Sequence, residues 1–128
     1  MTLRIVFGPA VAFALCGAAL AQPASPPPGS EYDRCIASAG QRGSALAKCE
    51  QAAYRREDKA LNDAYQQLAA KVDVEAKAPL DRAQRAWLDY RDSECAYEAS
   101  HPGGAAPAPV VEARCMKRLT EQRAKDLR

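Results

Sequence analysis

Apolar residues recur at helical spacing over most of the chain after residue 31. Residues 44–72 contain neither glycine nor proline, and their apolar positions are separated by three, four and seven residues. Ser44 is a favourable N-cap for this segment. The pattern predicts one long helix to about Val72, with an apolar stripe formed by Tyr54, Leu61, Tyr65, Leu68 and Val72.

Three further helices are predicted around this one. A short helix over 32–39 ends before Gly40 and Gly43, and a turn begins at Asp73. Pro79 fits the first turn of a third helix that runs through Tyr97, and Pro109 opens a fourth. Residues 100–109 contain three prolines and two glycines and are typical of a loop. We therefore expect an all-α fold, a small helical bundle with two long central helices and a disulfide at each end.

The N-terminal residues have the pattern of a secretory signal peptide. Arg4 precedes an apolar run, and small residues at Ala19 and Ala21 suit cleavage after Ala21. The alternatives are a retained membrane anchor and a lipid-modified Cys16, although Leu15 is larger than lipid attachment prefers. We expect a signal peptide over 1–21, a proline-rich disordered leader over 22–31 and a helical domain over 32–128, without a membrane span after cleavage.

Cleavage would leave 107 residues, enough for one domain, and a net charge of +1. This near-neutral balance argues against a nucleic-acid partner. Both phenylalanines lie in the signal peptide, so the core depends on smaller aliphatic residues, Trp87 and tyrosines and needs covalent support. The four remaining cysteines predict two disulfides in an exported domain, with three possible pairings. We favour the local one, which pairs Cys35 with Cys49 and Cys95 with Cys115.

Polar residues interrupt the apolar faces where a simple bundle would carry leucine. A carboxylate that faces a core is costly unless it is paired, so we expect Asp58 to meet Arg91 or Arg123 across the bundle. The alternative is a polar groove that recognises a ligand. The predicted structural network consists of Asp58, Asn62, Gln84, Trp87, Arg91, Thr120 and Arg123.

No catalytic, metal or cofactor site is predicted. His101 is the only histidine and lies in the predicted loop, and oxidised cysteines offer no thiol nucleophile. The chain has no phosphate-binding loop and no dinucleotide fingerprint. Carboxylates that are neighbours on a helix point in different directions, whereas acid–base catalysis needs convergent groups. We therefore expect a binding protein and not an enzyme.

Three segments resemble the LprI-type lysozyme inhibitor domain. These are Cys49 with Asp58-x-x-Leu61-Asn62-x-x-Tyr65-x-x-Leu68, then Ala83-Gln84-x-x-Trp87-Leu88-x-Tyr90-Arg91-Asp92-x-x-Cys95, and finally Cys115-Met116-x-x-x-Thr120-x-x-Arg123-x-x-x-Leu127. The last often has leucine where this chain has methionine. The resemblance covers about 32–127 and implies an all-helical periplasmic or secreted protein. Its motif residues are those of a scaffold, so no catalytic role and no inhibitory surface are carried over.

The family name implies inhibition of lysozyme, whose cleft is lined by two catalytic carboxylates. A rigid bundle would block this cleft with a loop, for which residues 100–109 and the turn at 40–43 are candidates. Animal lysozymes are typically basic, however, and the chain lacks the acidic net charge that would steer it toward them. The alternative hypothesis is an interaction or adaptor module that binds another envelope protein.

Overall fold

The computed structural model describes residues 29–101, 103–104 and 106–128. This part of the chain forms four helices and contains no strand, so the predicted all-α fold is confirmed. None of the described helices is long and apolar enough to cross a membrane. The predicted signal peptide and all but the end of the leader lie outside the described residues. The helices are α1 (Glu31–Ala39), α2 (Gly43–Ala69), α3 (Val74–Ser100) and α4 (Ala108–Asp126).

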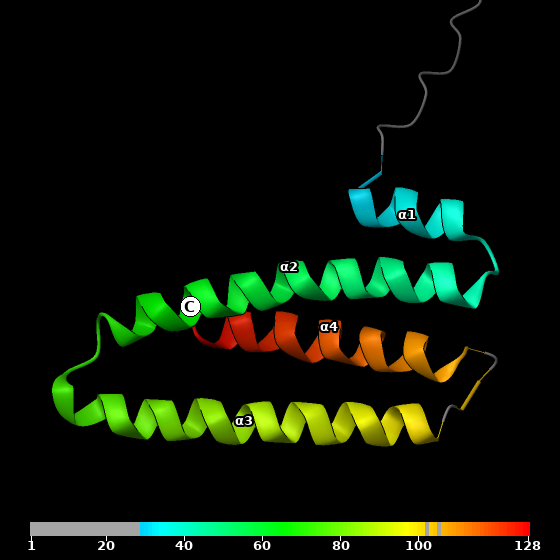
Figure 1. Ribbon diagram of the computed structural model, residues 1–128. Helices are drawn as coiled ribbons and strands as arrows, with labels where there is room; N and C mark the ends of the chain where they lie inside the picture. The colour runs from blue at the N-terminus through cyan, green and yellow to red at the C-terminus, as the bar shows by residue number, and fades with distance from the viewer. Residues whose placement is uncertain (1–28, 102, 105) are drawn as a thin grey trace, which may run out of the picture.

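The helices pack in the spatial order α1, α2, α4 and α3 (Figure 1). The two predicted long helices, α2 and α3, occupy the middle of the chain and run antiparallel because residues 70–73 form a short turn. In space, α4 lies between them and contacts both, and α1 packs on the outer side of α2. Contacts between α2 and α3 therefore depend on long side chains that reach across α4.

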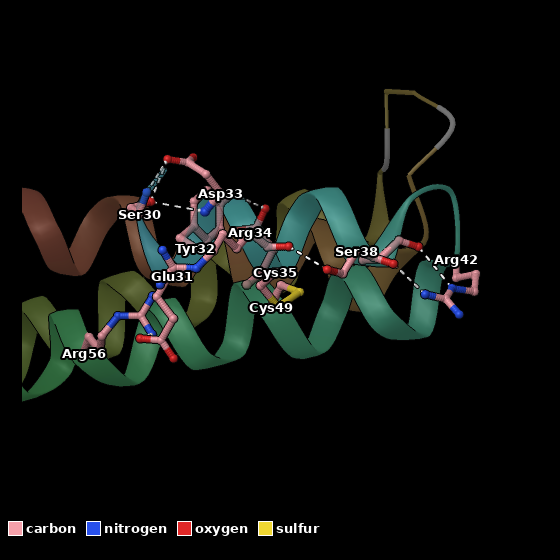
Figure 2. The surroundings of a disulfide bond; sticks show 12 residues. Ser30, Glu31, Tyr32, Asp33, Arg34, Cys35, Ser38, Arg42, Cys49 and Arg56 are labelled. Atoms are coloured by element: carbon pink, nitrogen blue, oxygen red, sulfur yellow. Dashed lines mark hydrogen bonds and ion pairs between the residues drawn. A yellow bond between two sulfur atoms is a disulfide. The ribbon is translucent and has the colours of Figure 1, made fainter. Parts of the chain in front are cut away.

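The starts of α1 and α3 are set by side-chain caps. Ser30 accepts a hydrogen bond from the backbone N–H of Asp33, whose carboxylate accepts one from the N–H of Ser30 (Figure 2). Asp73, expected in a turn, instead caps α3 by accepting from the N–H of Ala76 at 3.2 Å. As a result α3 begins at Val74 and Pro79 lies in its second turn, so the prediction that Pro79 occupies the first turn was wrong.

A tertiary contact accompanies the start of α2. The helix begins at Gly43, with Arg42 at the N-cap position and no side-chain cap. The prediction that Ser44 is the N-cap was therefore wrong. A Cβ atom on Gly43 would lie only 2.7 Å from Cγ of Pro107, the residue that precedes α4. The absence of a side chain at Gly43 therefore lets the start of α2 approach the start of α4. Gly40, at the end of α1, has a φ of 55° that glycine adopts readily.

Both predicted disulfides are present with the favoured pairing. Cys35–Cys49 joins α1 to α2, with 5.7 Å between the Cα atoms, and Cys95–Cys115 joins α3 to α4, with 5.4 Å. The expectation of one disulfide at each end of the bundle was wrong, because both lie toward the end where α2 starts and α3 ends. The four helices are thus linked in two covalent pairs.

The core is small and rich in alanine. One cluster consists of Leu61, Ala64, Ala124 and Leu127, against which Trp87 and other partly buried residues pack. Small side chains between α2 and α4 let the two helices approach closely, but they bury little apolar surface. The further buried alanines of these two helices are Ala47, Ala53 and Ala113.

Candidate functional site

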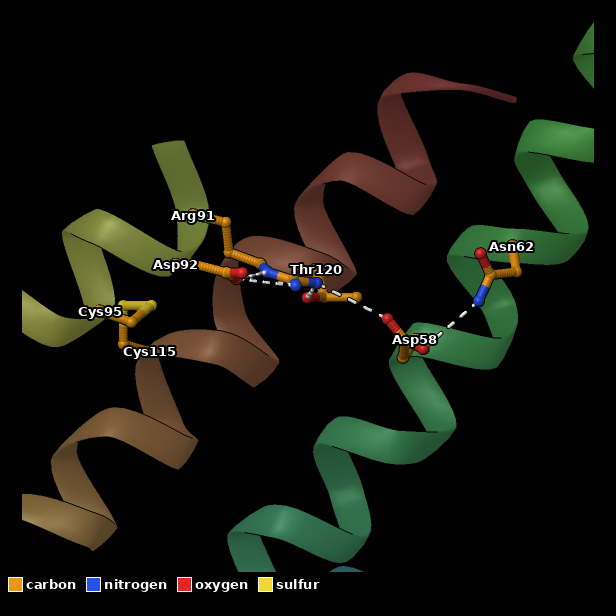
Figure 3. A network of polar contacts seen from close by, with 7 residues as sticks. All are labelled: Asp58, Asn62, Arg91, Asp92, Cys95, Cys115 and Thr120. Atoms are coloured by element: carbon orange, nitrogen blue, oxygen red, sulfur yellow. Dashed lines mark hydrogen bonds and ion pairs between the residues drawn. A yellow bond between two sulfur atoms is a disulfide. The ribbon is translucent and has the colours of Figure 1, made fainter. Parts of the chain in front are cut away.

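A network centred on Arg91 spans α2, α3 and α4 (Figure 3). The Arg91 side chain is only 7% exposed, and its guanidinium lies 3.6 Å from an oxygen of Asp58 and 2.8 Å from one of Asp92. It also donates a hydrogen bond of 3.4 Å to the buried hydroxyl of Thr120. One cation from α3 therefore reaches across α4 to a carboxylate on α2, one of the two pairings that the sequence analysis considered.

The other predicted network residues join this centre. Asn62 donates to Asp58 at 3.3 Å, and Arg123 donates to Gln84 at 3.1 Å. The Trp87 ring contacts both arginines: its centre lies 5.4 Å from the guanidinium carbon of Arg91 and 5.7 Å from that of Arg123. The structure thus brings all seven predicted residues into one chain of contacts.

The burial within the network differs from the expectation. The side chain of Asp58 is 41% exposed, so the carboxylate does not face the core, and Arg91 is the buried charge instead. Asp92 was not among the predicted network residues, although it is the nearest partner of Arg91. Water screens both carboxylates, which lets them neutralise Arg91 without a large desolvation penalty of their own.

Two tyrosines extend the contacts between α2 and α3. The Tyr65 hydroxyl donates to Asp81, and this bond raises the pKa of Tyr65. The Arg91 guanidinium carbon lies 5.6 Å from the centre of the Tyr54 ring. Burial raises the pKa of Tyr54, and the neighbouring charges of Asp58 and Asp92 raise it further, against the opposing effect of Arg91. Tyr54 and Tyr65 were predicted as members of the apolar stripe, and the Tyr54 ring and the Tyr65 hydroxyl add these contacts with charged groups.

A second polar cluster, missed by the sequence analysis, surrounds Glu50 of α2. Its side chain is 0% exposed. Oε1 accepts from the Tyr32 hydroxyl at 2.8 Å and from Arg114 at 3.0 Å, while Oε2 forms an ion pair with Lys117 at 2.9 Å. The Lys117 ammonium also lies 4.0 Å from the centre of the Tyr32 ring. This cluster connects α1, α2 and α4.

The pKa values in this cluster follow from the balance between burial and pairing. Burial would raise the pKa of Glu50, but contacts with Lys117, Tyr32 and Arg114 outweigh burial and hold the pKa below its ordinary value. Burial would lower the pKa of Lys117, but Tyr32 and Glu50 raise it. Both groups therefore keep their charges at neutral pH. One sequence signal would have found Glu50: it stands four residues before Tyr54, in line with the apolar stripe of its helix.

The two predicted binding loops lie next to each other. The turn after α1 and the connection from α3 to α4 meet where Gly43 contacts Pro107. Exposed His101 shares a hydrogen bond with the Ser100 hydroxyl at 2.8 Å, and its ring lies 4.8 Å from that of Tyr97. No group of three potential metal-ligating residues occurs in the described part of the chain. The two loops thus form one end surface of the bundle.

Comparison with known proteins identifies the family. Residues 35–127 match the family described as "Lysozyme inhibitor LprI". An uncharacterized protein of Rhizobium meliloti (strain 1021) is 29% identical over 133 aligned positions, covering 94% of this chain and 91% of that protein. No solved structure gives a significant match. Because the family match spans both disulfides and the whole Arg91 network, the chain belongs to the LprI lysozyme inhibitor family.

Proposed function

We propose that this protein binds lysozyme outside the cytoplasm and inhibits it by obstructing the substrate cleft, without catalysing a reaction. The observation that carries the proposal is the family match over residues 35–127. Two disulfides suit an oxidising compartment, and we propose export by a signal peptide cleaved after Ala21. The mass of the mature N-terminal peptide tests the cleavage site.

The arrangement of the polar residues supports binding as the activity. Among the described residues, the buried charged side chains are Arg91 and Glu50, and each has a partner of opposite charge on a neighbouring helix, which joins the helices to one another. A framework held in this way presents its surface with little loss of conformational entropy on binding. We propose that the predicted network has this scaffold role and that the inhibitory contacts lie on exposed residues around it.

A cell-wall lysis assay tests the proposed function directly. The oxidised protein, exported with its own leader and purified, is titrated against c-type and g-type lysozymes while the turbidity of a cell-wall suspension is followed. Dose-dependent protection that is lost after reduction of the disulfides is the expected result. Unchanged lysis at micromolar excess over both enzymes would overturn the proposal.

One observation favours the alternative of an adaptor for another envelope protein. The outer side of α3 carries an exposed, uncharged stripe with residues spaced by three and four. Exposed aromatic residues on such a face suit a protein contact. If lysis is unaffected, cross-linking in the periplasm with a photoreactive residue at position 90 tests this alternative. The stripe consists of Ala83, Ala86, Tyr90, Ser93 and Tyr97.

A further inference from the structure

A groove with a volume of about 210 Å³ opens between α2 and the first half of α4. A single water needs only about 10–15 Å³ by a comparable measure, so the groove has room for a long side chain. Its walls combine an aromatic ring, a thioether and a carboxylate. The lining residues are Gln51, Tyr54, Pro109, Glu112, Ala113 and Met116.

Carboxylates outnumber cations around this groove. Glu112 lines it and is exposed, and it forms no ion pair with another described residue. Asp58 and Asp92 both pair with Arg91, whose guanidinium carbon lies 5.6 Å from the centre of the Tyr54 ring, so their charges lie near the groove wall. Their side chains are 41% and 61% exposed, whereas Arg91 between them is almost completely covered. Water and an approaching partner therefore meet the carboxylates and not the guanidinium.

The cations near the groove count against these carboxylates, so their positions matter. Arg55 follows Tyr54 on α2 and is exposed. On the groove side, the two arginines, Arg55 and Arg91, are outnumbered by the three carboxylates named above. On α4, Arg114 and Lys117 together carry one positive charge more than their partner Glu50 neutralises. Both side chains extend toward Glu50, which also contacts Tyr32 of α1, so this positive charge lies on the side of α4 that faces α1. The near-neutral net charge of the chain thus conceals a local separation of charge. This separation gives the chain a small acidic surface with which to meet a basic lysozyme, although its net charge is near neutral.

We propose that the α2–α4 groove binds an arginine or lysine side chain from a loop of the basic partner, which under the proposed function is lysozyme. The aliphatic part of that side chain packs against Met116 and the Tyr54 ring, and the cationic end pairs with Glu112. Asp58 and Asp92 add long-range attraction. Pro109 places the groove directly beside the end surface formed by the two loops, so one partner can contact both.

Charge reversal at Glu112 tests the groove. The full-length exported protein and its Glu112→Lys variant are titrated with c-type lysozyme by calorimetry, at low and at moderate ionic strength. The matched control is Asp126→Lys, which makes the same charge change at an exposed position of α4 outside the groove. We expect Glu112→Lys to weaken binding by about tenfold or more and the control by less than about twofold. Circular dichroism melts establish that both variants are folded.

The outcomes separate the groove from the proposed function. If the wild-type protein binds and Glu112→Lys binds equally well, the groove is not the contact, and the inhibitor function stands. If both charge reversals weaken binding equally, the effect is one of net charge and the groove assignment is wrong. If the wild-type protein binds neither c-type nor g-type lysozyme, the proposed function and the groove assignment fall together. Affinity that does not decrease with added salt would also contradict the electrostatic part of the proposal.

Discussion

Replacing Glu50 by alanine should strongly destabilise the fold, because the substitution removes a buried carboxylate that three side chains contact. The carboxylate is fully covered and receives contacts from Tyr32, Arg114 and Lys117. Arg114 is 53% exposed and regains water when its partner is lost, so it contributes little to the cost. Lys117 is only 20% exposed, and the Tyr32 hydroxyl loses its acceptor in a half-buried position.

The magnitude follows from these two stranded groups. An unpaired buried charge costs about 3–5 kcal/mol, and Lys117 belongs near the lower limit because its ammonium keeps the contact with the Tyr32 ring. We therefore expect the free energy of unfolding to fall by about 3 kcal/mol. Tyr32→Phe removes a single hydrogen bond to the carboxylate and should cost about 1.5 kcal/mol.

Urea denaturation of the oxidised proteins, followed by far-ultraviolet circular dichroism, measures these differences. Because Tyr32 and Glu50 are in contact, the double mutant should lose less than the sum of the single mutants. A decrease below about 1 kcal/mol for Glu50→Ala, or full additivity with Tyr32→Phe, would refute the view that the cluster is an energetic link between α1, α2 and α4.

The same cluster predicts how stability depends on pH. The pKa of Glu50 in the folded protein is lowered from its ordinary value of 4.5 because contacts outweigh burial. The contribution of Glu50 to the stability of the fold is thus fully present above the unfolded-state pKa and is lost as pH falls through the folded-state pKa. Wild-type protein should lose stability below about pH 4.5, and Glu50→Gln should lose less over the same range. Parallel curves for the two proteins would contradict this assignment.

Three further substitutions test the packing and the staples. Gly43→Ala should lower the melting temperature, because the new Cβ atom would lie 2.7 Å from Cγ of Pro107. Such an overpacked contact costs about 1–3 kcal/mol, which exceeds the gain in helix propensity. A raised melting temperature would show that Pro107 moves away without a large cost. Asp58→Asn should lower the free energy of unfolding by less than about 1 kcal/mol, because the Asp58 side chain is 41% exposed. Arg91→Ala should lower it by about 2–3 kcal/mol, because packing and hydrogen bonds are lost. Equal losses of stability for the two variants in urea titrations would contradict this order. Cys115→Ala opens a disulfide with a sequence separation of 20 and should cost about 3 kcal/mol, and an unchanged urea midpoint would contradict the role of this staple.

The all-α class was predictable because it depends on local information. Long segments without glycine or proline and with apolar residues three and four apart can bury their stripe only as helices. The local disulfide pairing also followed, since Cys35 with Cys49 and Cys95 with Cys115 each close a short helix–turn–helix. The ends of the helices were less predictable. Pro79 is tolerated in the second turn because the favourable cap at Asp73 starts α3 earlier.

The partners of the polar residues were predictable only in part. The pattern placed Asp58, Arg91 and Thr120 toward the interior of a bundle, and they lie in contact. Which member of the network is buried depends on how far each side chain extends across α4. Arg91 is long enough to span that helix, so its guanidinium lies in the interior while Asp58 stays near the surface.

The amino-acid sequence by itself determined the helices, the covalent links and the set of polar residues that had to be satisfied. Only the tertiary structure decided that α4 lies between the two long helices, because the packing order depends on the fit between faces that are distant in the chain. The same arrangement buries Glu50 among three partners from α1 and α4 and leaves Glu112 beside an open groove. These two glutamates thus acquire different roles, since the energy of a charge depends on the groups that the fold places around it.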